Sequence, residues 1–545
     1  YQLDKDKEAL EAYLEHSVKV RMKKFSTIKE KIDYLVKNNY YSEKVIKQYS
    51  TIYIEKLYEF IKNQDFKFES YMSASKFFEN YALKSNDGKS ILESYEDKIL
   101  IVSLALANGD ENFAMKIADK LIKQEFQPAT PTFLNAGRAR AGEMVSCFLI
   151  SVEDSCEGIS YAVASANHLS KIGGGVALNL SRLRASGESI KDIEGAAGGV
   201  VGVAKMLEQS FSYFNQMGAR QGAGAVYLNV LHPDFELLMD TKKINADEKI
   251  RLTNLSVGAI IPDKFMELAE KNEVAYAFYP NSIYKKYGLH LDDINMNEWY
   301  DKLASDEDIK KKEINPRQML TKIAQMQQES GYPYVVFIDT ANKEHILKDV
   351  GNIKMSNLCC EIFQYQTPSD IQGYGGNNNW GQDISCNLGS LNIANVMKNK
   401  DIENVVDVAI RSLSIVSDKT NIKEVPTVAN GNNASHAVGL GAMNLHGYLM
   451  KENILYTSED AIDFANVFFA LVRYYAIKSS MNLSIEKGKT FEGFEKSEYA
   501  KGRNSDVLGK YYEEEFLPKS EKVKKLFEGI YIPTKYDWAS LLDEV

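Results

Sequence analysis

The stretch Asn357-Leu358-Cys359-Cys360-Glu361 constrains this chain more than any other segment of its sequence. Because side chains alternate between the two faces of an extended strand, Asn357, Cys359 and Glu361 would point the same way. One surface would then carry an amide that orients hydroxyl groups, a thiol for nucleophilic or radical chemistry, and a carboxylate that accepts a proton. Cys360 would face the other side and pack. The alternative interpretation is a buried strand with a stray polar face, since buried cysteines outside disulfides are common.

Bulk composition argues against several classes of function. The chain has 545 residues and a formal net charge of −10, which argues against broad binding to nucleic acid or to acidic membranes. Its length suits about three domains, or one large barrel with an accessory domain. No apolar run is long enough to span a bilayer, and the first residues show no secretion signal. We therefore expect neither a nucleic-acid nor a membrane partner.

The cysteines indicate a reducing compartment. There are five of them, an odd and small number for so long a chain, which is not typical of a secreted disulfide framework. The absence of a Cys-x-x-Cys pair and the presence of only seven histidines argue against a structural zinc site, and we expect no metal site. The natural compartment is the cytoplasm, or the host cytoplasm for a viral protein. Thiols that carry out chemistry are plausible there.

Apolar spacing divides the chain near residue 125. Residues 1–125 have the spacing of three and four that predicts helices, as in Ile28, Ile32 and Leu35. A Pro-rich break at 127–132 follows, and then short apolar runs alternate with helical patterns, which favours an α/β barrel or a wound sheet. The predicted strands are 146–152, 176–180, 225–230 and 250–261, and the predicted helices include 201–214, 264–271 and 317–330. From residue 459 onward the pattern is again mostly helical.

Five longer motifs, spread across most of the chain, carry a family resemblance. They are Gln-Pro-Ala-Thr-Pro-Thr-Phe-Leu-Asn-Ala-Gly (127–137), Val-Ser-Cys-Phe-Leu (145–149), Ala-Arg-Gln-Gly-Ala-Gly-Ala-Val-Tyr-Leu (219–228), Met-Ser-Asn-Leu-Cys (355–359) and Asp-Ile-Ser-Cys-Asn-Leu-Gly-Ser-Leu-Asn-Ile-Ala (383–394). With these motifs the chain resembles the large, catalytic subunit of a class I ribonucleotide reductase. It is most similar to the class Ib form.

The resemblance implies a fold and also two departures from it. The fold is a ten-stranded α/β barrel of two half-barrels (126–545), preceded by a helical N-terminal domain (1–125). The N-terminus is too short for the ATP cone of many class I enzymes. At the other end, the chain lacks the family's Pro-rich phosphate loop, its Tyr-Tyr pair and its C-terminal Cys pair. The expectation is therefore an incomplete barrel, from a truncated chain or, as we favour, from a catalytic subunit split into two polypeptides.

By position in the motifs, the resemblance also implies catalytic roles. The implied reaction is reduction of ribonucleoside diphosphates to their 2′-deoxy forms, for DNA precursor synthesis. Cys359 would become a thiyl radical that abstracts the 3′ hydrogen, Glu361 would accept the 3′-hydroxyl proton, and Asn357 would hydrogen-bond the sugar hydroxyls. Cys147 and Cys386 would supply two electrons and become a disulfide, and Cys147 would also protonate the departing 2′-hydroxyl. The remaining cysteine, Cys156, has no implied role.

Binding residues carry over in the same way. Small residues let backbone N–H groups approach a diphosphate closely, so the further substrate-binding positions would be Thr130, Ser146 and Gly175. The positions that would bind an effector nucleotide are Asp154, Ser155, Arg184 and Lys191. A loop that relays effector identity to the substrate site would include Arg220 and Gln221.

The resemblance implies no covalently bound cofactor, but several ligands and partners. The effectors would be dATP or ATP, dTTP and dGTP, with Mg²⁺ accompanying the nucleotide. The partners would be a radical-generating dimetal small subunit, a complementing C-terminal polypeptide, a second copy of this chain, and a thioredoxin- or glutaredoxin-like reductant.

Two other functions compete with this interpretation. A glycyl-radical enzyme would share the barrel and a cysteine thiyl, and could use the adjacent Cys359 and Cys360, but it leaves Cys147 and Cys386 unexplained. The chain could instead be an effector-binding regulatory half or a decayed paralogue without activity. Nucleotide binding with no reduction under any complementation would support that second alternative.

Overall fold

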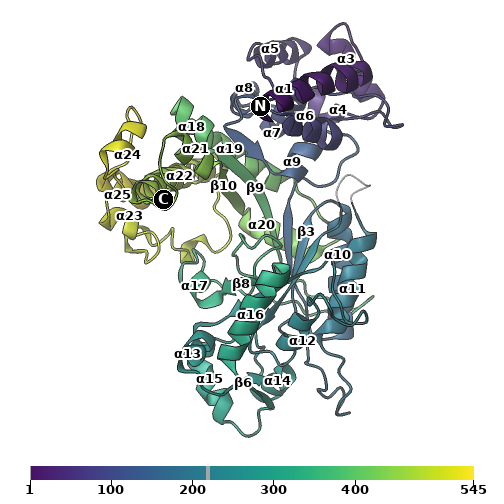
Figure 1. Cartoon of the computed structure of the whole chain (residues 1–545), viewed down its shortest axis with the longest axis vertical. Helices are drawn as coiled ribbons and strands as arrows, with labels where there is room; N and C mark the ends of the chain where they lie inside the picture. The colour runs from purple at the N-terminus through teal and green to yellow at the C-terminus, as the bar shows by residue number, and fades with distance from the viewer. Residues whose placement is uncertain (1, 216–220) are drawn as a thin grey trace.

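The computed structural model describes residues 2–215 and 221–545 of the chain. Helices gather at one end of the molecule, a curled sheet lies in the middle, and the last helices pack beside the second part of that sheet (Figure 1). Within the described residues, no helix has both the length and the apolar character needed to cross a bilayer.

The N-terminal part is all helical. Its longest helices present apolar faces to one another, and α7 is buried along almost its whole length because α5 and α8 pack against it. Side-chain caps begin several of these helices; the Thr27 hydroxyl, for example, accepts the backbone N–H of Glu30. The helices are α1 (Gln2–Tyr13), α2 (Lys19–Arg21), α3 (Ile28–Lys37), α4 (Glu43–Ile46), α5 (Thr51–Lys62), α6 (Tyr71–Lys76), α7 (Tyr95–Ala107) and α8 (Glu111–Ile122), with π-helical turns at Leu14–Val18 and Phe77–Tyr81.

Five parallel strands form the first half of the sheet, in the order β2-β3-β4-β5-β8. Their near-continuous apolar sequences suit strands that are covered on both faces. Helices α10 and α11 pack on one face, as Figure 1 shows. The strands are β2 (Cys147–Ser151), β3 (Gly175–Asn179), β4 (Gly224–Asn229), β5 (Ser256–Ile261) and β8 (Tyr334–Phe337), and the elements between them are α10 (Cys156–Lys171), α11 (Val200–Tyr213), α12 (Phe235–Asp240), α13 (Asp263–Lys271), β6 (Ala275–Phe278), α14 (Pro280–Tyr287), α15 (Met296–Ser305), β7 (Lys311–Ile314) and α16 (Pro316–Ser330).

One of the predicted strands is shorter than expected. The apolar run 250–261 becomes a strand only from Ser256. The reason is that the buried carboxylate of Glu208 accepts the backbone N–H groups of Thr253 and Asn254, at 2.6 and 2.8 Å, and so withdraws them from the sheet.

The second half of the sheet starts with β9, which runs antiparallel to β2 and pairs in parallel with β10. The short strand β1 pairs antiparallel with the far end of β9. Helices α19 and α20 pack against β9. These elements are β1 (Phe126–Pro128), α9 (Thr130–Asn135), α17 (Ile338–Lys343), β9 (Ile384–Asn392), α18 (Ile393–Asn399), α19 (Ile402–Lys419), α20 (Pro426–Ser435), β10 (Val438–Met443), α21 (Leu445–Lys451), α22 (Glu459–Lys487), α23 (Lys510–Glu513), α24 (Glu521–Leu526) and α25 (Lys535–Glu544).

The sheet is thus a partly closed barrel. Among the described strands, β8 and β10 each pair on one side only, so both leave an edge open. The expected fold class, an α/β barrel that is incomplete in this chain and follows a helical domain, is confirmed.

A buried ionic cluster joins the helical part to the segment that follows α9. Glu93 is fully buried and accepts hydrogen bonds from the Tyr41 hydroxyl at 2.8 Å and the Leu83 backbone N–H at 2.8 Å. Its carboxylate also pairs with Arg138 at 3.1 Å and with the fully buried Lys98 at 3.4 Å. Burial would raise the pKa of Glu93, but the Lys98 and Arg138 cations and these hydrogen bonds lower it to about 2.

Replacing Glu93 with Gln is expected to destabilise the protein by about 3 kcal/mol, because two buried cations lose their counter-charge. Urea unfolding at neutral pH measures this, with exposed Glu59→Gln on α5 as the control. The folded-state pKa of Glu93, about 2, lies below the ordinary 4.5. The advantage of the wild type should therefore be complete above the ordinary pKa and shrink as the pH falls toward the folded one. Equal stability of Glu93→Gln and wild type would contradict this.

Candidate active site

The segment Asn357–Glu361 is a turn, not the extended strand predicted from its sequence. The Asn357 side-chain oxygen accepts the backbone N–H groups of Glu361 and Ile362, at 2.9 and 3.0 Å. The Asn357 backbone carbonyl accepts the N–H of Cys360 at 3.1 Å, and Cys360 itself has φ +65°. A short polar side chain that binds nearby N–H groups competes with strand pairing, and here it folds the chain back on itself.

The turn separates the three side chains that alternation would have placed on one face. Asn357 is buried, whereas Cys359 and Glu361 are exposed. Cys360 is half-buried, and its thiol lies 3.8 Å from the Val335 carbonyl of β8. The prediction that Cys360 packs is confirmed, although the strand geometry behind it is wrong.

Three contacts hold the turn, two of them to the sheet. The Tyr227 hydroxyl, from β4, donates to the Asn357 carbonyl at 2.7 Å. The Ser356 hydroxyl donates to the Ile362 carbonyl at 2.9 Å and so closes the base of the turn. The Asn357 amide nitrogen lies 3.4 Å from the Cys147 sulfur of β2. Sequence reasoning did not single out Tyr227 or Ser356, although both stand inside the quoted motifs.

Cys147 and Cys386 lie directly opposite each other in the antiparallel pair β2–β9. Both are buried, in an apolar cluster that lines the concave side of the sheet. Opposed residues in an antiparallel pair have Cα atoms roughly 4.5–5.5 Å apart. That separation falls within the range of about 4.4–6.8 Å that a disulfide spans. The two thiols are 386 − 147 = 239 residues apart in sequence. The strand pairing nevertheless brings them close enough to exchange electrons as a pair.

Burial raises the pKa of the Cys386 thiol, and the neighbouring Cys147 and Glu361 raise it further. Cys386 therefore keeps its proton at neutral pH. The arrangement offers a carboxylate, an amide and two thiols on one side of the sheet.

Two of the three predicted substrate positions, Gly175 and Ser146, lie beside this group. Gly175 is the β3 residue paired with Cys147, and a Cβ atom there would lie 3.0 Å from the Leu358 side chain, so the glycine lets the turn approach closely. The buried Ser146 hydroxyl has no hydrogen-bond partner among the described residues. Thr130 lies elsewhere, at the start of α9, where its hydroxyl is 2.9 Å from that of Tyr81. It lines a cavity of about 330 Å³ beside β1.

The predicted effector positions lie at the opposite end of β2 and β3. Asp154 and Arg184 form an ion pair at 2.7 Å, and Ser155 caps α10 by accepting the Gly158 N–H at 2.9 Å. Lys191 is exposed in the loop that follows, with φ +50°.

The predicted relay loop is described only in part. Its Gln221 is exposed just before β4, and Arg220 lies outside the described residues.

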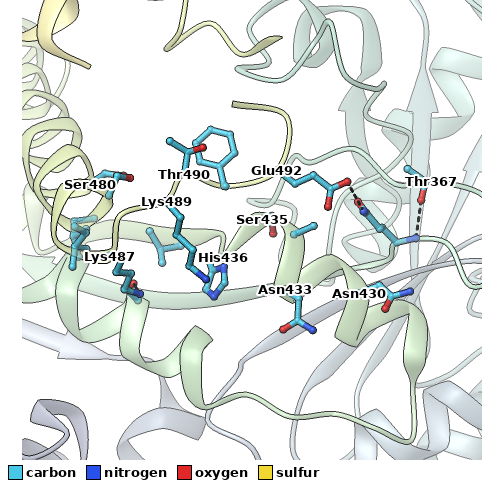
Figure 2. Close-up of a pocket in the computed structure, with 18 of the residues that line it drawn as sticks. Thr367, Asn430, Asn433, Ser435, His436, Ser480, Lys487, Lys489, Thr490 and Glu492 are labelled. Carbon is cyan, nitrogen blue, oxygen red and sulfur yellow. Dashed lines mark hydrogen bonds between the residues drawn. The ribbon is translucent and has the colours of Figure 1, made fainter. Parts of the chain in front are cut away.

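A second, larger cavity of about 650 Å³ opens beside the start of β10 (Figure 2). Its labelled residues are polar, among them His436, Lys487, Lys489 and Glu492. None of the predicted site residues lines this cavity. The predicted site residues therefore lie apart from this cavity.

Mild oxidation should join Cys147 to Cys386 without rearranging the sheet, because their strands already hold them in register. Peptide mapping after treatment with diamide should find this linkage, and the exposed Cys156 should remain open to alkylation. Cys156→Ser is the matched control and should oxidise in the same way. A dominant Cys359 linkage, or no linkage, would contradict the geometry.

Comparisons with known proteins match the chain along almost its whole length. Three family models match in order: "Ribonucleotide reductase N-terminal" over residues 1–66, "Ribonucleotide reductase, all-alpha domain" over 67–141, and "Ribonucleotide reductase, barrel domain" over 145–545. The ribonucleoside-diphosphate reductase subunit alpha of Bacillus subtilis is 51% identical, with 99% of this chain and 77% of that protein covered. The corresponding subunit of Mycoplasma pneumoniae is 46% identical, with 98% and 74% covered. The nrdEB subunit alpha of Bacillus phage SPbeta is 50% identical, with 66% and 33% covered. The chain belongs to the ribonucleotide reductase large-subunit family.

Proposed function

We propose that this chain reduces ribonucleoside diphosphates to 2′-deoxyribonucleoside diphosphates, as a catalytic subunit of class Ib type. The observation that carries the proposal is the register of β2 and β9, which sets Cys147 opposite Cys386, with the Asn357 amide 3.4 Å from the Cys147 sulfur. The named activity of the Bacillus subtilis relative, which matches nearly the whole chain, supports the same reaction. The helical part through residue 125 would then support a barrel that begins at residue 126.

The proposed chemistry needs three thiols and a base. Cys359, as a thiyl radical, takes the 3′ hydrogen atom, and Glu361 takes the 3′-hydroxyl proton. A radical at the neighbouring carbon lets the 2′-hydroxyl depart as water with a proton from Cys147. Cys147 and Cys386 together give up two electrons and two protons and become a disulfide. Cys359 then returns its hydrogen to the 3′ carbon, so substrate and two thiols yield product, disulfide and water.

Each proposed role fits the local environment of its residue. The exposed Glu361 can lose and regain a proton through solvent, and the raised pKa of Cys386 keeps that thiol protonated until it is oxidised. The buried Asn357 amide is held by the turn and can orient the ribose hydroxyls. The unpartnered hydroxyl of Ser146 and the close approach at Gly175 suit the substrate, and Thr130 would meet its diphosphate.

Allosteric control would use the other end of the barrel. Asp154 and Ser155 would read the base of a bound dATP, ATP, dTTP or dGTP, and Arg184 and Lys191 would meet its phosphates with Mg²⁺. The loop with Arg220 and Gln221 would pass effector identity to the substrate. Such control requires an element with two arrangements that different nucleotides favour differently.

The proposed function requires partners. A small subunit with a dimetal centre would supply the radical, and a thioredoxin- or glutaredoxin-like protein would supply electrons in the cytoplasm. A second copy of the chain would complete the catalytic dimer. The open edges of β8 and β10 call for further strands to close the barrel, which a complementing C-terminal polypeptide would provide.

Replacing Cys359 with Ser should abolish nucleotide reduction, because the hydroxyl cannot take the place of the thiyl. Nucleotide binding at Asp154 and Arg184 should stay unchanged, since these residues lie at the opposite end of β2 and β3 from the turn. A reduction assay with the radical-generating subunit and equilibrium binding of dTTP measure the two properties. Cys156→Ser is the control and should stay active. Retained reduction by Cys359→Ser would refute the assignment.

Strand complementation is a separate test. A polypeptide equivalent to the part of the Bacillus subtilis relative that this chain does not cover should bind this chain and raise its reductase activity. Co-elution on gel filtration and a turnover assay measure these effects. Robust turnover by this chain with only a radical-generating subunit would show that no complementing strands are required.

A further inference from the structure

A buried ionic chain runs between the effector end of the barrel and the cysteine turn. Arg182 is its centre: the guanidinium pairs with Asp292 at 2.8 Å, with Glu153 at 2.9 Å and with Asp293 at 3.2 Å. Asp293 in turn pairs closely with the ammonium of Lys354. The contacts therefore connect Glu153, Arg182, Asp293 and Lys354 in one continuous series.

Both cations of the series are shielded from water, whereas the Asp293 side chain between them is 32% exposed. The side chain of Arg182 is 2% exposed, that of Asp292 is 4% exposed and that of Lys354 is 7% exposed. Two cations face three carboxylates, so the cluster carries one excess negative charge. Removing one partner from such a buried group leaves an uncompensated charge, which favours a shift of the remaining groups.

Both ends of the series lie close in sequence to residues that have proposed roles. Glu153 directly precedes Asp154, and Arg182 lies two residues before Arg184, the partner of Asp154 at 2.7 Å. At the other end, Lys354 lies three residues before Asn357, whose side chain shapes the cysteine turn.

The backbone around Lys354 is fixed by independent contacts. The Asn179 amide, at the end of β3, donates to the Lys354 carbonyl at 3.3 Å. The Asn342 side chain, from α17, accepts the Ile353 N–H at 2.8 Å and donates to the Ile353 carbonyl at 3.0 Å. The Lys354 ammonium links this segment to the loop of Asp292 and Asp293.

An anionic ligand would perturb the series at its effector end. Phosphate groups that bind Arg184 compete with Asp154 for the same guanidinium, because both are anionic partners of one cation. The Asp154 charge would then be less neutralised, one residue away from Glu153. A shift of that loop would change the ion pair between Glu153 and Arg182. Through Asp293 it would also change the ion pair of Lys354.

We propose that Lys354 is a positioning residue for the Cys359 turn, and that the series Glu153–Arg182–Asp293–Lys354 couples effector binding to the placement of the Cys359 thiol. The inference rests on the proposed effector site but not on turnover. Linkage is reciprocal, so a nucleotide that shifts the turn must also bind differently to the two positions of the turn.

The reactivity of Cys359 tests the coupling without turnover. Iodoacetamide alkylation of the whole chain, followed by mass-spectrometric mapping of Cys359, is timed with and without dTTP and Mg²⁺. We expect dTTP to change the wild-type rate about fivefold or more, the lower end of typical allosteric coupling. In Lys354→Gln this change should disappear, whereas the dTTP dissociation constant measured by calorimetry should shift about twofold or less. A purely structural role would not remove the nucleotide response alone.

Conservative and control variants sharpen the test. Lys354→Arg keeps the charge toward Asp293 and should restore the response, and Lys343→Gln, an exposed lysine on α17, should respond like the wild type. Asp293→Asn replaces Lys354→Gln if the latter does not fold, and it should also lose the response.

The outcomes separate the coupling from the effector site. The coupling is overturned if bound dTTP does not change the alkylation rate of Cys359 in the wild type. It is also overturned if Lys354→Gln or Asp293→Asn responds to dTTP as the wild type does. Either result leaves the proposed reductase intact. Failure of dTTP to bind the wild type overturns the effector site and the coupling together.

Discussion

The side chain of Asn357 organises the proposed active site. The side-chain oxygen of Asn357 accepts two backbone N–H groups and so creates the turn, and the side-chain nitrogen lies next to the Cys147 sulfur. The backbone carbonyl of the same residue accepts the Tyr227 hydroxyl. A buried amide is costly unless its donors and acceptors find partners. Here the partners come from the turn itself and from two strands. The contacts that satisfy the amide therefore also fix the backbone positions from which the Cys359 and Glu361 side chains project.

The sheet provides the other half of the arrangement. Because β9 runs antiparallel to β2, residues from distant parts of the chain face each other in pairs, and one of these pairs is Cys147 with Cys386. A register shift by one residue would turn one thiol to the opposite face of the sheet. The apolar cluster around the pair excludes water and raises the pKa of Cys386, which suits a thiol that gives up its proton only together with its electrons.

Buried charges mark two places where separate segments meet. The protein has an excess of acidic residues, and two of its buried ionic clusters lie at joints between segments: Glu93 with Arg138 and Lys98, and Arg182 with its three carboxylates. The first joint holds the helical part against the segment that follows α9. The second connects the loops beyond β2 and β3 to the segment that leads into the cysteine turn. Buried ion pairs add little net stability, but they specify which segments must meet.

The sequence by itself determined the class of fold, the positions of most helices and strands, and the residue types of the site, because periodicity and motif order are local properties. It also determined that Cys147 and Cys386 mattered, but not that they share a register, since strand pairing depends on long-range packing. Alternation predicted a strand at 357–361; an amide that captures two N–H groups made it a turn. The strand expected from residue 250 began late because the carboxylate of Glu208, distant in sequence, holds the N–H groups there. Only the tertiary structure decided these points, since each depends on a partner that lies near in space and far along the chain.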